Sequence, residues 1–291
     1  MNPDVIKLTA IKAIFSDEKL EDILTLKGGN ALNLHGLTKR ESQDLDFSIK
    51  EQVRLSKEEE GEIFKERLSQ AFQEHGYELA SYRFQDKPKK RRQMTPPYWG
   101  GYHIEFSIIK IEELRVLREK NITNINAYAA PLEDGSKKIH IDLSFEEYTE
   151  PRVKKEIEGT TIYLYSPLMI IYEKIRASCQ QLDEYELTST KTRARDLYDI
   201  YSTLTDISNV ELREEVVNPD NFYIVRRMFT LKEVPIELIP KVKDIKTKLK
   251  ADYEQSVLPQ IPGNTERPDF EYLFSYNMEL FDELYTALNN N

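Results

Sequence analysis

The stretch that decides the fold is LKGGNAL at residues 26–32, followed by RESQDLDF at residues 40–47. The first part predicts a short strand, a di-glycine turn and a helix, and the second predicts a strand that carries Asp44 and Asp46. Because residues i and i+2 of a strand face the same way, we expect these two carboxylates to project side by side. The opposite face would be a core-facing row made of Leu45, Phe47 and Ile49.

Two neighbouring carboxylates on a rigid strand repel each other unless a cation lies between them. Mg²⁺ usually binds through one or two carboxylates together with substrate phosphates. Gly28 and Gly29 let the backbone approach a phosphate without a Cβ in the way, and the following helix points its first N–H groups at the anion. Each motif alone is weak, since a di-glycine is also an ordinary turn. Together they indicate phosphoryl or nucleotidyl transfer.

The combination resembles the nucleotidyltransferase superfamily to which DNA polymerase β belongs. In finer detail, KGGNAL and R-x-S-x-D-L-D-F are similar to the AbiEii/AbiGii family of bacterial nucleotidyltransferases, the toxin halves of toxin–antitoxin and phage-abortive-infection systems. The resemblance implies an NTP substrate, Mg²⁺ or Mn²⁺, and a cognate antitoxin protein. It also implies that Gly28, Gly29 and Asn30 cradle phosphate. Many relatives in the wider superfamily carry Gly-Ser at the turn, so Asn30 or Ser42 is expected to substitute for that hydroxyl.

Superfamily members typically add a third metal-binding carboxylate from a neighbouring strand. Residues 102–108 and 139–145 alternate cleanly between apolar and polar side chains, which predicts two half-buried strands. The alternation places Asp142 and Glu105 opposite the core. Asp142 is the candidate for the third ligand and Glu105 is the alternative; either of them is otherwise a surface acid on a half-exposed sheet.

A second cluster consists of Lys174 and the run RARDLYD at residues 193–199. It resembles the helical motif of the same toxin family, in which a lysine is followed by R-x-R-D-L-Y-D. The resemblance implies that Lys174 binds the triphosphate. Arg193 and Arg195 are candidates for the same role, because a guanidinium group can bind a phosphate through two hydrogen bonds. Asp196 would orient the lysine, contact the nucleotide or act as a general base. The alternative is that these charges only stabilise the helix through pairs spaced i, i+3 and i, i+4.

The composition narrows the class of protein. The chain has 291 residues, 40% hydrophobic and 32% charged, with a net charge of −10. No apolar stretch approaches the roughly 20 residues that span a bilayer, and the N-terminus lacks a secretion-signal pattern. The single cysteine, Cys179, excludes an intrachain disulfide and fits a reducing cytoplasm. One cysteine and four scattered histidines also disfavour a zinc site. The negative net charge argues against a general affinity of the whole surface for nucleic acid. Basic runs lie at residues 87–92 and 241–250. We expect each run either to be a solvated surface or to contact the phosphates of a polynucleotide.

The fold class predicted from these patterns is α/β (α+β), with a nucleotidyltransferase-type mixed sheet, flanking helices and a C-terminal helical bundle. The domains are expected at 1–165 and 166–291, because Ser166-Pro167 is typical of a helix start and few strand signals follow it. The bundle would close the cleft with Lys174 and Asp196. Within it, the helices are predicted at about 167–182, 193–204, 221–229, 238–254 and 270–288.

The function predicted from these features is Mg²⁺-dependent transfer of NMP from an NTP to a macromolecular acceptor such as tRNA, with release of pyrophosphate. One alternative is transfer to a small molecule such as an aminoglycoside, for which a closed acidic pocket is expected rather than an open basic groove. The other is a non-catalytic module on the same fold that binds nucleic acid or a partner protein. Retention of both Asp44 and Asp46 argues against that module.

Overall fold

The computed structural model describes residues 2–38, 44–90, 95–132, 135–187, 192–263 and 265–290. The chain divides into two compact units. The first comprises Met1–Leu26, Gln43–Thr149 and Val153–Leu164, and the second comprises Lys27–Ser42, Glu150–Arg152 and Tyr165–Asn291. The expected domain boundary at residue 165 stays a prediction, and the segment after the first strand groups with the C-terminal helices.

The first unit contains the sheet. Within the described residues its seven strands lie in the order β3-β4-β5-β2-β1-β7-β6. β2 runs parallel to β5 and β1 parallel to β7, whereas the β3–β4, β4–β5 and β6–β7 pairs are antiparallel. The predicted mixed α/β sheet is therefore confirmed. The strands are β1 (Leu24–Lys27), β2 (Leu45–Lys50), β3 (Tyr77–Lys87), β4 (Gly101–Lys110), β5 (Ile139–Glu147), β6 (Val153–Ile157) and β7 (Thr160–Leu164).

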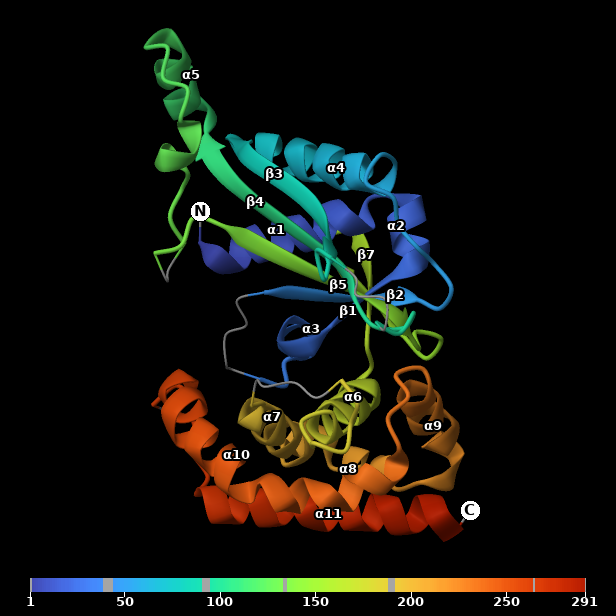
Figure 1. Ribbon diagram of the computed structural model, residues 1–291. Coiled ribbons are helices and arrows are strands. Elements are labelled where there is room, and N and C mark those ends of the chain that lie inside the picture. The colour runs from blue at the N-terminus through green and yellow to red at the C-terminus, as the bar shows by residue number, and fades with distance from the viewer. Residues whose placement is uncertain are drawn as a thin grey trace. The chain divides into compact units, whose positions relative to one another are not determined.

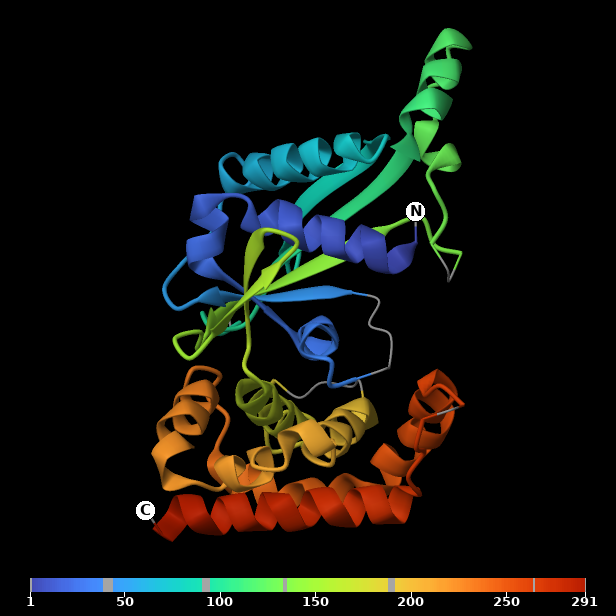
Figure 2. The ribbon, with the colours of Figure 1, turned by 180° about the vertical axis from the view of Figure 1, so that it is seen from behind.

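Helices α1 (Pro3–Phe15) and α4 (Glu60–Glu74) cover one face of this sheet, as the two opposite views show (Figures 1 and 2). Phe15 of α1 packs against Phe47 of β2 with ring centroids 5.9 Å apart, and Phe72 of α4 packs against Phe106 of β4 at 5.7 Å. All four rings are buried, so the alternation seen in the sequence does place one apolar face in the core. The unit also contains α2 (Glu18–Ile23), α5 (Ile111–Glu119) and a 3₁₀ turn, η1 (Ile125–Tyr128).

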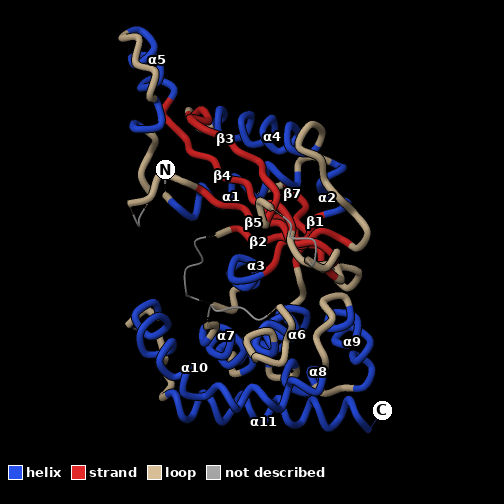
Figure 3. Tube along the Cα trace, in the orientation of Figure 1, coloured by secondary structure: helices blue, strands red, loops and turns tan. Residues whose placement is uncertain are grey.

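The second unit is helical in its described part (Figure 3). Its centre is α6 (Pro167–Cys179), which begins where Ser166 Oγ accepts a hydrogen bond from the Met169 N–H at 3.2 Å and which is buried on nearly every side. Around it lie α3 (Gly28–His35), α7 (Ala194–Leu204), α8 (Leu212–Val216), α9 (Phe222–Thr230), α10 (Lys246–Asp252) and α11 (Phe270–Asn290), with short turns η2 (Ile207–Asn209), η3 (Pro219–Asn221), η4 (Ile236–Ile245), η5 (Tyr253–Val257) and η6 (Leu258–Gln260).

The prediction of a single α-helix over residues 238–254 is wrong. Instead of a continuous α-helix over 238–254, the chain forms the 3₁₀ segment η4, then α10, then the π-helical turn η5. Pro240 lies inside η4 and has no N–H to donate, so an α-helical hydrogen bond is lost there and the ring clashes with the preceding turn. Among the described residues, no helix has both the length and the apolar character needed to cross a membrane.

Gly101 fixes the pairing of β4 with β5. A Cβ built on Gly101 would lie 1.6 Å from the carbonyl oxygen of Leu143, which is backbone and cannot move aside without breaking the ladder. We expect Gly101→Ala to lower the free energy of unfolding by at least about 3 kcal/mol, since overpacking against backbone exceeds ordinary core strain. Urea denaturation would measure it. Gly263→Ala is the control, because nothing lies within 4 Å of a Cβ there; equal effects of the two substitutions would contradict the prediction.

Candidate active site

The polar face of the sheet carries a row of side chains across three neighbouring strands. Asp46 of β2 is paired in register with Asp142 of β5, and Asp142 is paired with His103 of β4. Directly paired residues project to the same face of a sheet. The two carboxylates therefore come from strands that adjoin each other in the sheet but lie almost a hundred residues apart in the sequence.

The carboxylate of Asp142 contacts two side chains, those of Lys87 and His103. Its Oδ2 accepts from Lys87 Nζ at 2.6 Å, and its Oδ1 lies 2.7 Å from His103 Nδ1. Burial raises the pKa of Asp142, but the hydrogen bonds from Lys87 and His103 outweigh it and hold the pKa below its ordinary value. Asp142 is therefore a carboxylate at neutral pH and a poor proton acceptor.

The other predicted metal-binding acids are Asp44, Asp46 and Glu105, and they differ in burial and in strand pairing. Asp44 is exposed and lies just before β2, while Asp46 is half-buried at the second position of that strand. Glu105, the alternative third ligand, is paired in register with His140 instead, and its carboxylate binds Lys138 at 2.8 Å. The register thus brings Asp142, rather than Glu105, next to Asp46.

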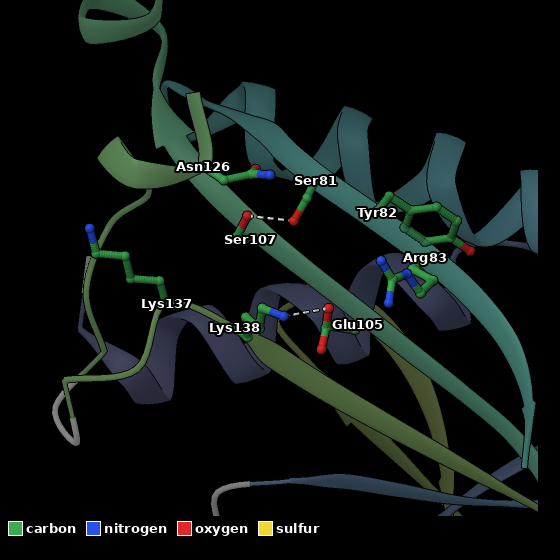
Figure 4. Close-up of a pocket in the computed structure, with 8 residues that line it drawn as sticks. All are labelled: Ser81, Tyr82, Arg83, Glu105, Ser107, Asn126, Lys137 and Lys138. Atoms are coloured by element: carbon green, nitrogen blue, oxygen red, sulfur yellow. Dashed lines mark hydrogen bonds and ion pairs between the residues drawn. The ribbon is translucent and has the colours of Figure 1, made fainter. Parts of the chain in front are cut away.

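A hollow of about 160 Å³ lies on the same unit, between β3, β4 and the segment that leads into β5 (Figure 4). The hydroxyls of Ser81 and Ser107 meet at 2.7 Å on its floor. Among the described residues its lining is basic on balance, since they include three cationic side chains and one acid that is already paired with one of them. The lining residues are Ser81, Tyr82, Arg83, Glu105, Ser107, Asn126, Lys137 and Lys138.

The second unit contains the lysine cluster. Lys174 Nζ donates to Asp196 at 3.0 Å and to Asp199 at 2.6 Å, and Arg193 Nε donates to Asp196 at 2.6 Å. The side chains of Asp196 and Asp199 are 1% and 0% exposed, and that of Lys174 is 7% exposed. The lysine is thus oriented by two buried carboxylates from α7, whereas Arg195 is exposed.

The charges in this cluster stabilise one another. Burial raises the pKa of Asp196, but Arg193, Lys174 and Arg195 together lower it far below the ordinary aspartate value. Burial lowers the pKa of Lys174, but Asp196 and Asp199 raise it above the ordinary lysine value. Asp196 and Lys174 are therefore both ionised at neutral pH. Asp199 contacts Lys174 of the neighbouring helix.

This cluster predicts an acid-sensitive stability. Because the pKa of Asp196 is lowered by folding, its charge stabilises the folded state above about pH 4, the unfolded value, and this contribution is lost as the pH falls below that. We expect Asp196→Asn to be less stable than the wild type at pH 7 and the difference to shrink below about pH 4. Urea unfolding of both proteins from about pH 3 to pH 7 measures it. A difference that stays constant with pH would rule out this linkage.

The glycine turn also lies in the second unit. Gly28 opens α3 with φ 66°, a left-handed conformation that glycine adopts readily. The preceding residue, Lys27, does not cap α3 with its side chain; its Nζ binds Glu173 Oε1 of α6 at 2.8 Å. Gly29 and Asn30 are buried in the first turn of the helix, and Ser42 lies outside the described residues.

Sequence reasoning missed several partners. Lys87 and His103 hold Asp142, Asp199 shares Lys174, and Glu173 binds Lys27. The alternation did place His103 on the polar face, but nothing local says which strand lies beside β4. The basic run at 241–250 proved partly neutralised, since Lys246 and Lys250 both contact Glu271.

Comparison with family models identifies the chain. The model described as the nucleotidyl transferase AbiEii toxin of type IV toxin–antitoxin systems matches residues 9–276. The chain belongs to this family. That range contains the glycine turn, the aspartate strand and the Lys174–Asp196 cluster, so this AbiEii protein is a toxin-family nucleotidyltransferase with an NTP substrate. Membership also implies an antitoxin partner.

The comparison with solved structures finds proteins of low sequence identity to this chain. JHP933 from Helicobacter pylori is 17% identical with a TM-score of 0.49, covering 99% of this chain and 92% of that one. MenT4, a nucleotidyltransferase toxin from Mycobacterium tuberculosis H37Rv, is 13% identical with a TM-score of 0.41, covering 97% of this chain and 86% of that one. The comparison with curated proteins gives no match.

Proposed function

We propose that this AbiEii toxin transfers a nucleoside monophosphate from an NTP to the 3′ end of an RNA, with tRNA as the first candidate acceptor, in the cytoplasm. The observation that carries the proposal is the pairing of Asp46 with Asp142 on adjacent parallel strands in a chain of this family. The growth inhibition that results is expected to be neutralised by the cognate antitoxin.

The acidic residues fit a magnesium ion. Asp44 just before β2, Asp46 of β2 and Asp142 of β5 supply carboxylate oxygens only, which is the donor chemistry that Mg²⁺ and Mn²⁺ prefer. A carboxylate has about four lone-pair positions, so Asp142 retains acceptor capacity beyond its bonds to Lys87 and His103. When bound, the ion would activate the attacking hydroxyl and neutralise charge on the leaving group.

In the proposed reaction, the 3′ hydroxyl oxygen of the acceptor attacks the α-phosphorus of the NTP. A new P–O bond forms, the bond from the α-phosphorus to the bridging oxygen breaks, and pyrophosphate leaves with the electron pair. The hydroxyl proton is released to the solvent, and we assign neither Asp142 nor Asp196 as a general base, because the pKa of each carboxyl is held below its ordinary value.

The residues of the second unit are proposed to bind the triphosphate. Gly28, Gly29 and Asn30 present backbone N–H groups at the start of α3, where an anion is favoured. Lys174, Arg193 and Arg195 supply positive charge, and Asp196 orients Lys174 and Arg193 through the contacts described above. Ser42 is retained as a proposed phosphate contact on the sequence pattern alone.

The hollow on the first unit supports a nucleic-acid acceptor. Arg83, Lys137 and Lys138 line it, and its one described acid, Glu105, is already paired with Lys138. Such a surface repels a cationic aminoglycoside and attracts phosphates of a polynucleotide backbone. We therefore place RNA ahead of a small-molecule acceptor.

Incubation with each of the four α-labelled NTPs tests the proposal. We expect label to enter total tRNA in the presence of Mg²⁺, and not after EDTA treatment. RNA oxidised with periodate, which destroys the terminal cis-diol, is the control that reports a 3′ acceptor. Label that enters oxidised RNA equally well, or that appears on the protein itself, contradicts the proposed acceptor.

A further inference from the structure

Two of the histidines that are scattered in the sequence meet on the polar face of the sheet. His140 of β5 and His103 of β4 lie with their rings nearly parallel, 5.2 Å between centroids, and His140 Nδ1 is 3.3 Å from His103 Nε2. Glu105 joins them, because it is paired in register with His140 and lies two residues beyond His103 on the same strand face. One ligand atom from each of the three residues lies within 4.8 Å of the other two.

We propose that His103, His140 and Glu105 bind a divalent transition-metal ion, with Zn²⁺ as the first candidate. None of these three ligands belongs to the aspartate pair, and Asp142 takes part only as the hydrogen-bond partner of His103. Two imidazoles and one carboxylate are ligands for zinc, cobalt, nickel or ferrous iron, whereas Mg²⁺ takes oxygen ligands. The inference does not depend on the transfer reaction, and it revises the view from composition that too few histidines were available for such a site.

The distance between the two ring nitrogens suits this ion. Two nitrogens bound at about 2.0–2.1 Å to a tetrahedral ion lie about 3.3–3.4 Å apart. The observed 3.3 Å matches this separation. All three ligands also project from the paired strands β4 and β5, whose ladder fixes their positions better than a loop would.

The surroundings of His103 are those of a metal-bound histidine. Its Nδ1 lies 2.7 Å from a carboxylate oxygen of Asp142, and since the carboxylate only accepts, this nitrogen carries the proton. In the neutral ring the lone pair is then on Nε2, the atom that faces His140. Metal-binding histidines almost always donate their other N–H to such a carboxylate or carbonyl, which fixes the tautomer.

Glu105 can bind the metal ion if the ion replaces the ammonium group of Lys138 as its partner. Its present partner, Lys138, contacts it at 2.8 Å and has a side chain that is 55% exposed, so the ammonium can move into solvent. Lys138 therefore competes with the metal. This competition predicts that removing the lysine charge strengthens metal binding, an effect opposite to that of removing a ligand.

The experiment uses untagged protein, stripped with EDTA and desalted, and follows the visible absorption of Co²⁺ together with calorimetric titration of Zn²⁺. We expect one ion per chain that excess Mg²⁺ does not displace. His140→Ala and Glu105→Gln should each weaken binding more than about a hundredfold, and Asp142→Asn about 10- to 100-fold as the outer partner of a ligand. Lys138→Met should tighten it.

Two substitutions serve as controls that should leave the affinity unchanged. His75→Ala removes an exposed histidine elsewhere on the unit, and Asp46→Asn removes a carboxylate of the proposed magnesium site. Binding that survives His140→Ala, or that is lost in Asp46→Asn, overturns the proposal, as does the absence of binding by both ions. If His140→Ala fails to fold, the other two variants still test the proposal. Glu105→Gln should weaken metal binding, whereas Lys138→Met should strengthen it.

Discussion

Asp46→Asn is expected to lower the rate of nucleotidyl transfer by about a thousandfold or more, with little change in stability. The substitution removes a charge from the residue that the sheet pairs with Asp142, and thereby part of the proposed metal-binding set. A bound metal ion contributes several kcal/mol to the stabilisation of the transition state, and about 4 kcal/mol corresponds to a thousandfold change in rate. Single-turnover transfer of labelled NMP at saturating NTP measures it.

The matched control is Asp282→Asn, which makes the same chemical change at an exposed position of α11. The control should retain wild-type activity, and thermal unfolding should show both variants folded. Raising the Mn²⁺ concentration should recover part of the lost rate in Asp46→Asn only. Activity of that variant within tenfold of the wild type would remove Asp46 from the catalytic set.

Lys174→Met is expected to lower the free energy of unfolding by about 3–5 kcal/mol, the usual result of breaking a buried ion pair from one side. The methionine keeps most of the volume but leaves the carboxylates of Asp196 and Asp199, which are 1% and 0% exposed, without the ammonium between them. Asp196 retains its contact with Arg193 at 2.6 Å, which limits the loss at that carboxylate. Urea denaturation at pH 7 provides the measurement.

The double variant Lys174→Met/Asp199→Asn separates structure from nucleotide binding. It removes both charges of the Lys174–Asp199 contact, so we expect its loss of stability to be smaller than the sum of the two single losses by at least about 1 kcal/mol. Lys241→Met, which breaks only an exposed pair with Glu184, should leave stability unchanged. If the stable double variant binds NTP as tightly as the wild type, Lys174 positions the helices and does not bind triphosphate.

Local patterns accounted for a large part of the fold. Alternating side chains identified the strands around Phe47, Phe106 and Leu143, because burial of one face imposes a period of two on the sequence. Ser166 and Pro167 marked the start of α6 correctly, since both act within the first turn. The α-helix expected around Pro240 was wrong, because apolar spacing alone does not show that the residue lacks a donor.

The candidate site depended on contacts that no local pattern contains. The sequence by itself determined the family, through two neighbouring acids, a glycine turn, and a lysine with an R-x-R-D motif. The tertiary structure alone decided that Asp142 is the neighbour of Asp46, that Lys174 lies between two aspartates, and that His103 meets His140. The physical reason is that alternation fixes which face of a strand a side chain occupies, whereas strand order and register are set by packing between distant segments.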